Sequence, residues 1–492
     1  MVARFKADEI VSALAAVFTT FPEECNPQGP AVVAKLCEFF TQFSYAAANT
    51  KDDDGDHLEF AALNCLGGIR AVMDHTQYTP ERMASFISSA GTLAVRLMDK
   101  ESDLVHWDYI QGAMDFIYSI AFNTPKGGFT ADHWALFEHA CFATLSYGSD
   151  FADVFASTTD PFIVKDVDTL LTRKAGSVVP SFAGRTMVQL LFDVHKHMVK
   201  TQSEDEMVYT SRPLCSTLLS ATGGRADALI PDILDHTAQL ICDLGHGVKA
   251  KTSALRIAGA SAMAAAMMNN PTLVASWMES KQVALPVLEA FVYSTTEGLS
   301  SLDKKMAAAG LVSLASVLPA SSALLPQVLA TAGLLAYQEE NGLTGAMVDD
   351  DGDEESDEEE ASGTDDGAIA ASGDDSGPVV IGEVDLADTD SVDHTMDQKI
   401  HDAIEAMPMD AGLGIWDVGV SEERMAANTG TTVISELDLP KAFFGIMSQA
   451  HVKPLVPSIM GMLPDDETRV GVNKVFTKGE ASASGISTGA GV

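Results

Sequence analysis

The sequence is poor in basic residues. Its 492 residues include 30 Lys and Arg against 70 Asp and Glu, which gives a formal net charge of −40. From Met306 to Gln398 there are 22 acidic residues and no Lys or Arg, so this segment supplies more than half of the net charge. A strongly anionic protein is repelled by phosphate backbones, so direct binding of nucleic acid is disfavoured and basic proteins are the natural partners.

Alternating runs of β-branched residues are also nearly absent, which disfavours a sheet protein. Residues 5–338 instead place apolar side chains at three- and four-residue spacing, in blocks of roughly 15–20 residues that are typical of amphipathic helices. Short connectors and a pair period of about 40 residues favour stacked antiparallel helix pairs. A single pair cannot bury its apolar face alone, so we expect an all-α fold, an α-α superhelix of the HEAT-type, armadillo-like solenoid class. Another all-α domain is the alternative.

Helix boundaries can be predicted at several places. Thr79 places a capping hydroxyl before Pro80 at the first helical position. The clearest repeat unit is VKAKTSALRIAGASAMAAAMMNNPTLVASWME, in which Asn269-Asn270-Pro271 separates two helices. Its small residues would let neighbouring helices approach closely; they are Ala260, Ala262, Ala264 and Ala265.

Long uncharged runs are rare, and the one present does not predict a membrane span. Residues from Met306 to Gln338 carry no charge and could cross a bilayer by length. Pro319 and Pro326 interrupt the run, however, so we expect two buried helices and no membrane span. The N-terminus lacks the uninterrupted apolar core of a signal peptide. The six cysteines are widely spaced and form no CxxC pair, which predicts reduced, buried thiols.

Beyond Gln338 the composition changes to Asp, Glu, Gly and Ser with few large apolar groups, which predicts disorder. We therefore expect four parts: a helical solenoid over 1–338, a disordered acidic loop over 339–393, closing helices over 394–465 and a disordered tail over 466–492.

Motifs for catalysis and cofactor binding are missing as well. GHGVKAKTS lacks the P-loop spacing, and no GxSxG, HExxH or GxGxxG follows a strand. Calcium loops built on Gly352 or Gly55 would begin at Met347 or Thr50, which do not fit the EF-hand pattern. We expect no cofactor, no dedicated metal site and no enzymatic activity.

Two further groups of side chains could bind a metal or a partner, but we interpret both as ordinary parts of the helices. His195 and His197 lie two residues apart and would point to different faces of one helix, so we interpret them as helix-surface histidines. An aromatic series at helical spacing is interpreted as core; it comprises Trp107, Tyr109, Phe116, Tyr118 and Phe122.

The stretch DDDGDEESDEEE has ten acidic side chains in twelve residues. One interpretation is a solvated linker that keeps the solenoid soluble. The other is a flexible polyanion that attracts Lys- and Arg-rich proteins, with an affinity that falls as salt rises. The residues of this candidate binding element are Asp349, Asp350, Asp351, Asp353, Glu354, Glu355, Asp357, Glu358, Glu359 and Glu360.

The order of several stretches resembles the C-terminal half of importin-β superfamily nuclear transport receptors, in the branch of importins seven and eight. GSDFADVFASTTDPF is followed by KDVDTLLT, and three later stretches lie upstream of the acidic run in the same order. These are GGRADALIPDILDHTAQLI, KTSALRIAGASAMAAAMMNNPTLV and LSSLDKKMAAAGLVSLASV.

The resemblance implies a receptor segment that binds basic cargo, such as ribosomal proteins or histones, through the solenoid and the acidic loop. It also implies contact with nucleoporins and a location in cytoplasm and nucleus, with transit through the pore of the nuclear envelope. Receptors of this family are about twice as long, so we expect a fragment and assign binding of the GTPase Ran only if N-terminal repeats exist. A scaffold or chaperone-like binder of basic proteins, without transport, is the alternative.

Overall fold

The structure is a computed structural model that describes residues 7–50, 54–102, 104, 106–147, 151–201, 204–242, 250–296, 301–341, 434 and 437–484. All of these residues belong to one structural unit. The described residues form helices, and their only β-type pairing is an isolated bridge between Lys174 and Thr186.

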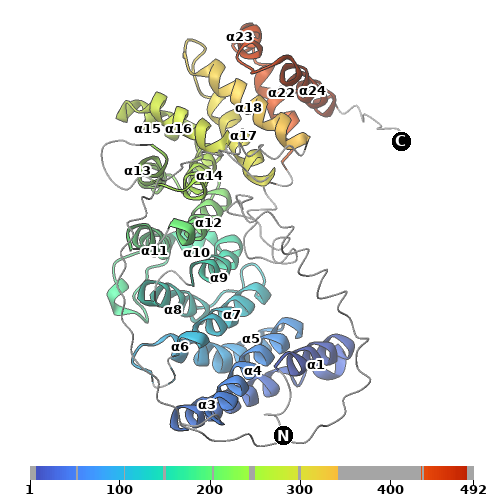
Figure 1. Ribbon diagram of the computed structural model, residues 1–492, viewed down its shortest axis with the longest axis vertical. Helices are drawn as coiled ribbons and strands as arrows, with labels where there is room; N and C mark the ends of the chain where they lie inside the picture. The colour runs from blue at the N-terminus through green and yellow to red at the C-terminus, as the bar shows by residue number, and fades with distance from the viewer. Residues whose placement is uncertain are drawn as a thin grey trace, which may run out of the picture. The chain divides into compact units, whose positions relative to one another are not determined.

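Helices follow one another in chain order from the N-terminus (Figure 1). The first half of the chain forms α1 (Ala7–Thr20), α2 (Pro22–Cys25), α3 (Gly29–Asn49), α4 (Asp54–His75), α5 (Pro80–Phe86), the π-helical turn η2 (Ile87–Gly91), α6 (Thr92–Met98), α7 (Trp107–Asn123), α8 (Ala131–Tyr147), α9 (Ala152–Lys165), α10 (Val167–Thr172), the 3₁₀ turn η4 (Pro180–Phe182), α11 (Met187–Thr201) and α12 (Glu204–Ser220).

The second half forms α13 (Ile230–Ile241), α14 (Ser253–Asn269), α15 (Pro271–Lys281), α16 (Ala284–Thr296), α17 (Ser301–Ala315), α18 (Leu325–Glu340), α22 (Leu439–Met447), the 3₁₀ turn η5 (Lys453–Leu455), α23 (Val456–Gly461) and α24 (Asp466–Ala483).

These helices build a two-layer solenoid, as the hydrophobic pattern predicts. We call layer A the row in which each helix packs against the next: α1, α4, α7, α9, α12, α14, α17 and α22. Between consecutive members of layer A the chain passes through the helices of layer B, which are α3, α6, α8, α11, α13, the pair α15 and α16, and α18. The alternation continues through α22, so the residues after the acidic segment extend the same stack.

Helix caps and breaks explain several boundaries. The Thr79 hydroxyl accepts a hydrogen bond from the Arg82 amide, which confirms the predicted cap of α5. Asn270 ends α14 and caps α15 through the Leu273 amide at 3.0 Å, where the sequence predicts the break. The uncharged run at 306–338 forms parts of α17 and α18, separated at 316–324. Within the described residues, no helix combines the length and hydropathy of a bilayer-spanning segment.

Close approach of helices depends on small residues. A Cβ added to Gly310 of α17 would lie 2.9 Å from the Ala264 Cα of α14, so neither position can carry a larger side chain without separating the two helices. This contact agrees with the predicted role of the alanines in the repeat unit.

Buried or partly buried hydrogen bonds cross each step of layer A from α4 to α17. The donor and acceptor pairs are Arg70 to Asp115 (2.7 Å), Thr158 to the Met114 carbonyl (3.3 Å), Ser216 to Asp160 (2.7 Å), Asn269 to the Leu218 carbonyl (2.6 Å) and Ser261 to Asp303 (3.2 Å). Burial raises the pKa of Asp115 to about 6, although the Arg70 charge opposes the shift. A buried polar group costs free energy unless it is paired, so these pairs favour one register between neighbouring repeats.

A buried carboxylate organises the connection between α10 and α11. Glu138 of α8 is fully buried, and its two oxygens accept hydrogen bonds from the backbone amides of residues 176–179 and from the Ser177 hydroxyl. The shortest of these, from the Ser177 hydroxyl, measures 2.7 Å. One side chain therefore fixes four consecutive residues that contain no helix of their own.

The histidine interpretation is wrong for His195. Its side chain is buried at 1% exposure, and its Nε2 lies 3.0 Å from the Nε2 of His236 on α13. The His195 Nδ1 lies 2.8 Å from the Thr210 hydroxyl of α12. His195 lies on the face of α11 that packs into the solenoid, and neighbouring helices supply the partners that satisfy its two ring nitrogens.

The aromatic series is core only in part. Tyr109 and Phe116 are buried and Tyr118 is half-buried, as predicted. Trp107 and Phe122, at the first and penultimate positions of α7, are 45% and 38% exposed, so they are not core residues. None of the six cysteines, all of which lie in the described part of the chain, forms a disulfide; Cys65, Cys141 and Cys215 are buried and the others half-buried.

The predicted disordered tail is wrong for residues 466–483, which form α24. The segment reads as polar, yet Val472 and Val475 are buried at 1% and 4% exposure. Asp465 begins the helix by accepting a hydrogen bond from the Thr468 amide at 2.7 Å. Three features of the sequence indicate this helix: Asp465 as its N-cap, acidic residues in its first turn, and the two valines one turn apart.

Candidate functional site

The candidate binding element, Asp349 to Glu360, lies outside the described residues. The structure does describe the helices between which this segment is inserted. Layer B helix α18 ends at Glu340, and α22 of layer A begins at Leu439. The acidic segment therefore occupies the connection within one helix pair of the solenoid, a connection that takes only residues 50–53 between α3 and α4.

The start of the acidic segment is held by α24. Lys478 Nζ forms an ion pair with Glu340 Oε2 at the last residue of α18. The Asn341 side-chain amide donates to the Tyr337 carbonyl at 2.7 Å and so satisfies one of the free carbonyls at the helix end.

The end of the segment is held by the same helix. Asp438 caps α22 by accepting a hydrogen bond from the Lys441 amide at 2.9 Å, and its second oxygen accepts one from the Ser482 hydroxyl of α24. Burial alone would raise the pKa of Asp438, but these hydrogen bonds and the charges of Lys441 and Lys478 outweigh it and lower the pKa. The carboxylate is therefore stabilised in its charged form.

Lys478 and Ser482 lie four residues apart on α24, which is about 6 Å along a helix axis at 1.5 Å per residue. The residues on either side of the acidic segment, Glu340 and Asp438, are thus held on neighbouring turns of one helix, and Ile434, the first described residue after the segment, is already buried. We call this arrangement the α24 clamp, defined by Glu340, Asp438, Lys478 and Ser482. It makes the segment an insertion held at both ends instead of a linker between two bodies.

Close packing supports the clamp. A Cβ added to Gly479 would clash with the Pro440 carbonyl oxygen, so α24 contacts the first turn of α22 backbone to backbone. The rings of Phe444 and Phe476 lie 5.1 Å apart between the same two helices. Helix α24 is consequently positioned by contacts on both sides of the ion pair.

An open pocket of about 600 Å³ lies between the end of α18 and α24. Three carboxylates line it, from Glu340, Asp466 and Glu467, together with two lysines of α24, Lys474 and Lys478. The C-terminal end of α18 adds the negative end of a helix dipole. Lys478 pairs with Glu340 and Arg469 pairs with Asp466, so Glu467 is the pocket carboxylate that remains for a cationic side chain beside the start of the acidic segment.

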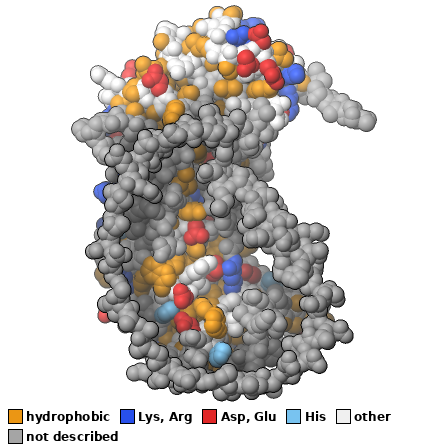
Figure 2. All heavy atoms as spheres, viewed as in Figure 1, with side chains coloured by type: hydrophobic (Ala, Val, Ile, Leu, Met, Phe, Trp, Pro, Cys, Tyr) orange, Lys and Arg blue, Asp and Glu red, His pale blue; other side chains and the backbone are white. Residues whose placement is uncertain are grey.

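The described helices also offer apolar surface. In the face shown in Figure 2, a band of apolar side chains is interrupted by acidic, basic and histidine side chains. Exposed aromatic residues on layer A include Phe60 at 63% and Trp107 at 45%. Aromatic side chains are enriched where proteins contact one another.

No family model, curated protein or solved structure matches this chain.

Proposed function

We propose that the chain binds basic proteins, using the solenoid as a frame and the acidic segment as an electrostatic element. The observation that carries this proposal is the α24 clamp, in which Lys478 holds Glu340 and Ser482 holds Asp438. Both ends of the segment are thus attached to the solenoid, which tethers the ten clustered acids to it through the chain.

The charge of the segment suits a basic partner. Each exposed ion pair contributes only about 0.2–1 kcal/mol, so no single acid decides the affinity. Ten acids together produce a strong local field that increases the rate of encounter and discriminates against acidic proteins. Such binding weakens as salt screens the charges, with a Debye length of about 8 Å at physiological ionic strength.

We further propose that this binding serves nuclear import, with histones or ribosomal proteins as cargo and nucleoporins as transit partners. The support is the resemblance to importins seven and eight together with the helical-repeat fold, in which an acidic segment is inserted late in the solenoid. A scaffold or chaperone-like binder that shields basic proteins without transport is the second candidate, because the same clamp and charge would serve it equally.

Neutralising the acidic run tests the binding proposal. The ten acids from Asp349 to Glu360 are changed to Ser and Asn, and binding of core histones is measured at low and at physiological salt. We expect the association rate at low salt to fall at least ~10-fold, since steering by charge changes rates by ~10–1,000-fold. A matched control reorders residues 349–360 without changing their composition, and should bind as the native chain does. Unchanged binding by the neutralised variant would show that the run is a solvated linker.

Displacement by Ran separates the two roles. A transport receptor that retains the Ran interaction should release bound histone when GTP-loaded Ran is added, and GDP-loaded Ran should not cause release. A scaffold is indifferent to both forms. The test is made on a chain that includes the N-terminal repeats if they exist, and release by neither form from that chain would favour the scaffold and leave the binding proposal intact.

A further inference from the structure

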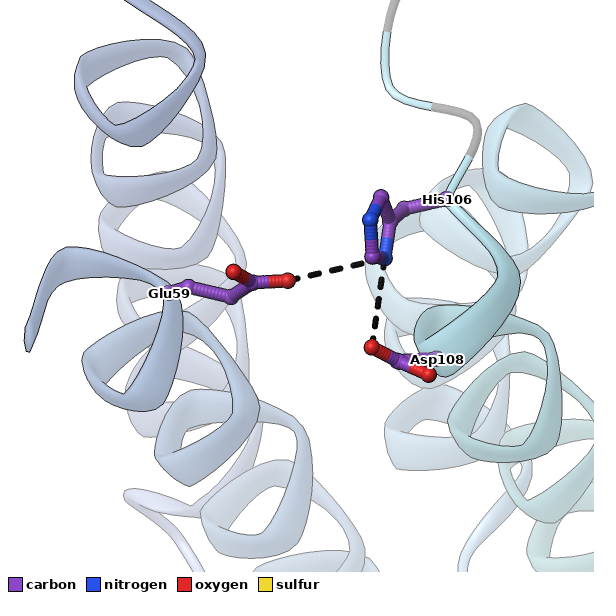
Figure 3. A group of neighbouring side chains, drawn as sticks. All are labelled: Glu59, His106 and Asp108. Carbon is purple, nitrogen blue, oxygen red and sulfur yellow. Dashed lines mark ion pairs between the residues drawn. The ribbon is translucent and has the colours of Figure 1, made fainter. Parts of the chain in front are cut away.

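A cluster of three potential metal ligands bridges α4 and α7, the second and third helices of layer A, far along the chain from the α24 clamp. Glu59 lies on α4, His106 is the N-cap residue of α7, and Asp108 lies in the first turn of α7. Figure 3 shows the imidazole between the two carboxylates, with Glu59 reaching across from the neighbouring helix. The three ligand atoms lie within 4.8 Å of one another.

The distances do not suit direct hydrogen bonds. The His106 Nδ1 lies 3.6 Å from Glu59 Oε1 and 3.5 Å from Asp108 Oδ2. A charge-assisted N–H···O bond measures about 2.7–2.9 Å, and one Nδ1–H can point at only one acceptor. Both carboxylates nevertheless converge on the same nitrogen.

The same distances suit a shared ion. Zinc binds imidazole nitrogen at about 2.0–2.1 Å and carboxylate oxygen at about 2.0–2.2 Å, with tetrahedral geometry. Two ligands of such a site are separated by roughly 3.3–3.5 Å, the edge of the tetrahedron. The two nitrogen–oxygen distances are close to that edge, so small side-chain adjustments would place an ion between the three groups.

Neighbouring rings orient the histidine. The His106 ring packs against Tyr109 with centroids 5.2 Å apart, and Tyr109 in turn meets Phe40 edge-on at 5.0 Å. Trp107 packs against Phe151 at 4.9 Å and so fixes the start of α7. The imidazole is thus positioned by contacts that do not depend on a metal.

We propose that Glu59, His106 and Asp108 bind a divalent transition-metal ion of the zinc type, which links the second and third helices of layer A. The imidazole nitrogen favours zinc over calcium or magnesium, which prefer sites made only of oxygen ligands. The ligands are partly exposed, with side-chain exposures of 35% for Glu59, 50% for His106 and 58% for Asp108. The fourth coordination position therefore faces solvent and is open to water or to a partner's side chain.

Zinc titration of the full chain tests the site. Calorimetry is performed in excess Mg²⁺, which occupies the weak sites of the acidic run, and we expect one high-affinity Zn²⁺ per chain. Loss of a ligand should weaken binding by more than ~100-fold, because loss of even an outer hydrogen-bond partner costs ~10–100-fold. His106→Ala should therefore abolish the high-affinity phase, and Glu59→Gln, which preserves size, should weaken it strongly.

His75→Ala is the matched control, because His75 is exposed at the end of the same helix as Glu59 and belongs to no ligand cluster among the described residues. It should bind zinc as the native chain does. Equal zinc binding by the native chain and His106→Ala, or no binding by the native chain, would overturn the proposal. Co²⁺ substitution adds a readout of ligand type: a nitrogen and oxygen spectrum is expected, and a thiolate charge-transfer band would place the ion at a cysteine instead.

Discussion

The imidazole pair formed by buried His195 and half-buried His236 makes acid stability a test of the structure. His195 and His236 approach through their Nε2 atoms at 3.0 Å, so one ring must donate and the other accept. Protonation of the accepting ring turns its Nε2 into a donor and breaks this bond, and protonation of the donating ring places a positive charge in a poorly solvated site. Lys196 and Lys200 add positive charge near His236. Both rings are therefore held in their neutral forms.

The pKa values of His195 and His236 give the direction and the size of the change in folding stability with pH. Burial lowers the pKa of His236 to about 4 and that of His195 well below its ordinary value, with the charges of neighbouring groups adding to the effect. The folded state thus binds fewer protons than the unfolded state between about pH 4 and pH 6.5. Stability from His236 is fully present above pH 6.5 and is lost as pH falls toward 4. A shift of about 2.5 units corresponds to about 3 kcal/mol.

Substitution isolates this contribution. His236→Gln keeps a polar side chain that cannot take up a proton. The free energy of unfolding falls between pH 7 and pH 4 in both chains, and we expect the loss to be about 3 kcal/mol smaller in the variant than in the native chain. The comparison is made by urea unfolding, with hydrogen exchange of the α13 amides as a local readout, because repeat proteins can unfold in parts. His75→Gln, at an exposed position, is the control and should follow the native curve. Equal losses for His236→Gln and the native chain would refute the assignment of the pair as neutral.

Two further predictions concern buried and clamping contacts. Glu138→Gln should destabilise the chain by about 3–5 kcal/mol in urea unfolding and expose the amides of residues 176–179 to exchange, because an amide NH₂ then faces backbone donors. The control Glu289→Gln, at an exposed position, should change stability by less than about 0.5 kcal/mol. A similarly small effect at Glu138 would contradict the hydrogen bonds that its carboxylate accepts. In the double variant Lys478→Ala and Ser482→Ala, a protease should cut the acidic segment faster at its two ends, while amide hydrogen exchange in α4 and α7 stays unchanged. An unchanged cleavage pattern would show that the α24 clamp does not hold the segment.

The fold could be predicted from sequence because its determinants are local. The Thr79 cap, the Asn270 break and the spacing of apolar residues each act within one or two helical turns, and they decide where helices begin and end. Stacking in chain order then follows, because each helix pair needs its neighbours to bury its apolar face.

The partners of individual side chains could not be predicted in the same way. His195 reads as a surface residue until α13 brings His236 against it, 41 positions away in the chain. Glu59 and His106 come from helices of different repeats, and their proximity depends on the rotation of α4 against α7. Helix α24 was missed because its buried face is narrow and its composition polar, although Asp465 and the valines at 472 and 475 mark it in hindsight.

The position of α24 also explains how a solenoid can carry so long an insertion. The cost of closing a connection grows only with the logarithm of its length, so about 100 residues between α18 and α22 cost roughly 3 kcal/mol more than a connector of four. Burial of one large apolar side chain contributes about 1.5–3 kcal/mol. Phe443 of α22 and Val472 of α24 are both buried, at 0% and 1% exposure, so packing beyond the insertion offsets that cost. The acidic segment can therefore be long and charged without opening the stack, provided that α22 and α24 follow it.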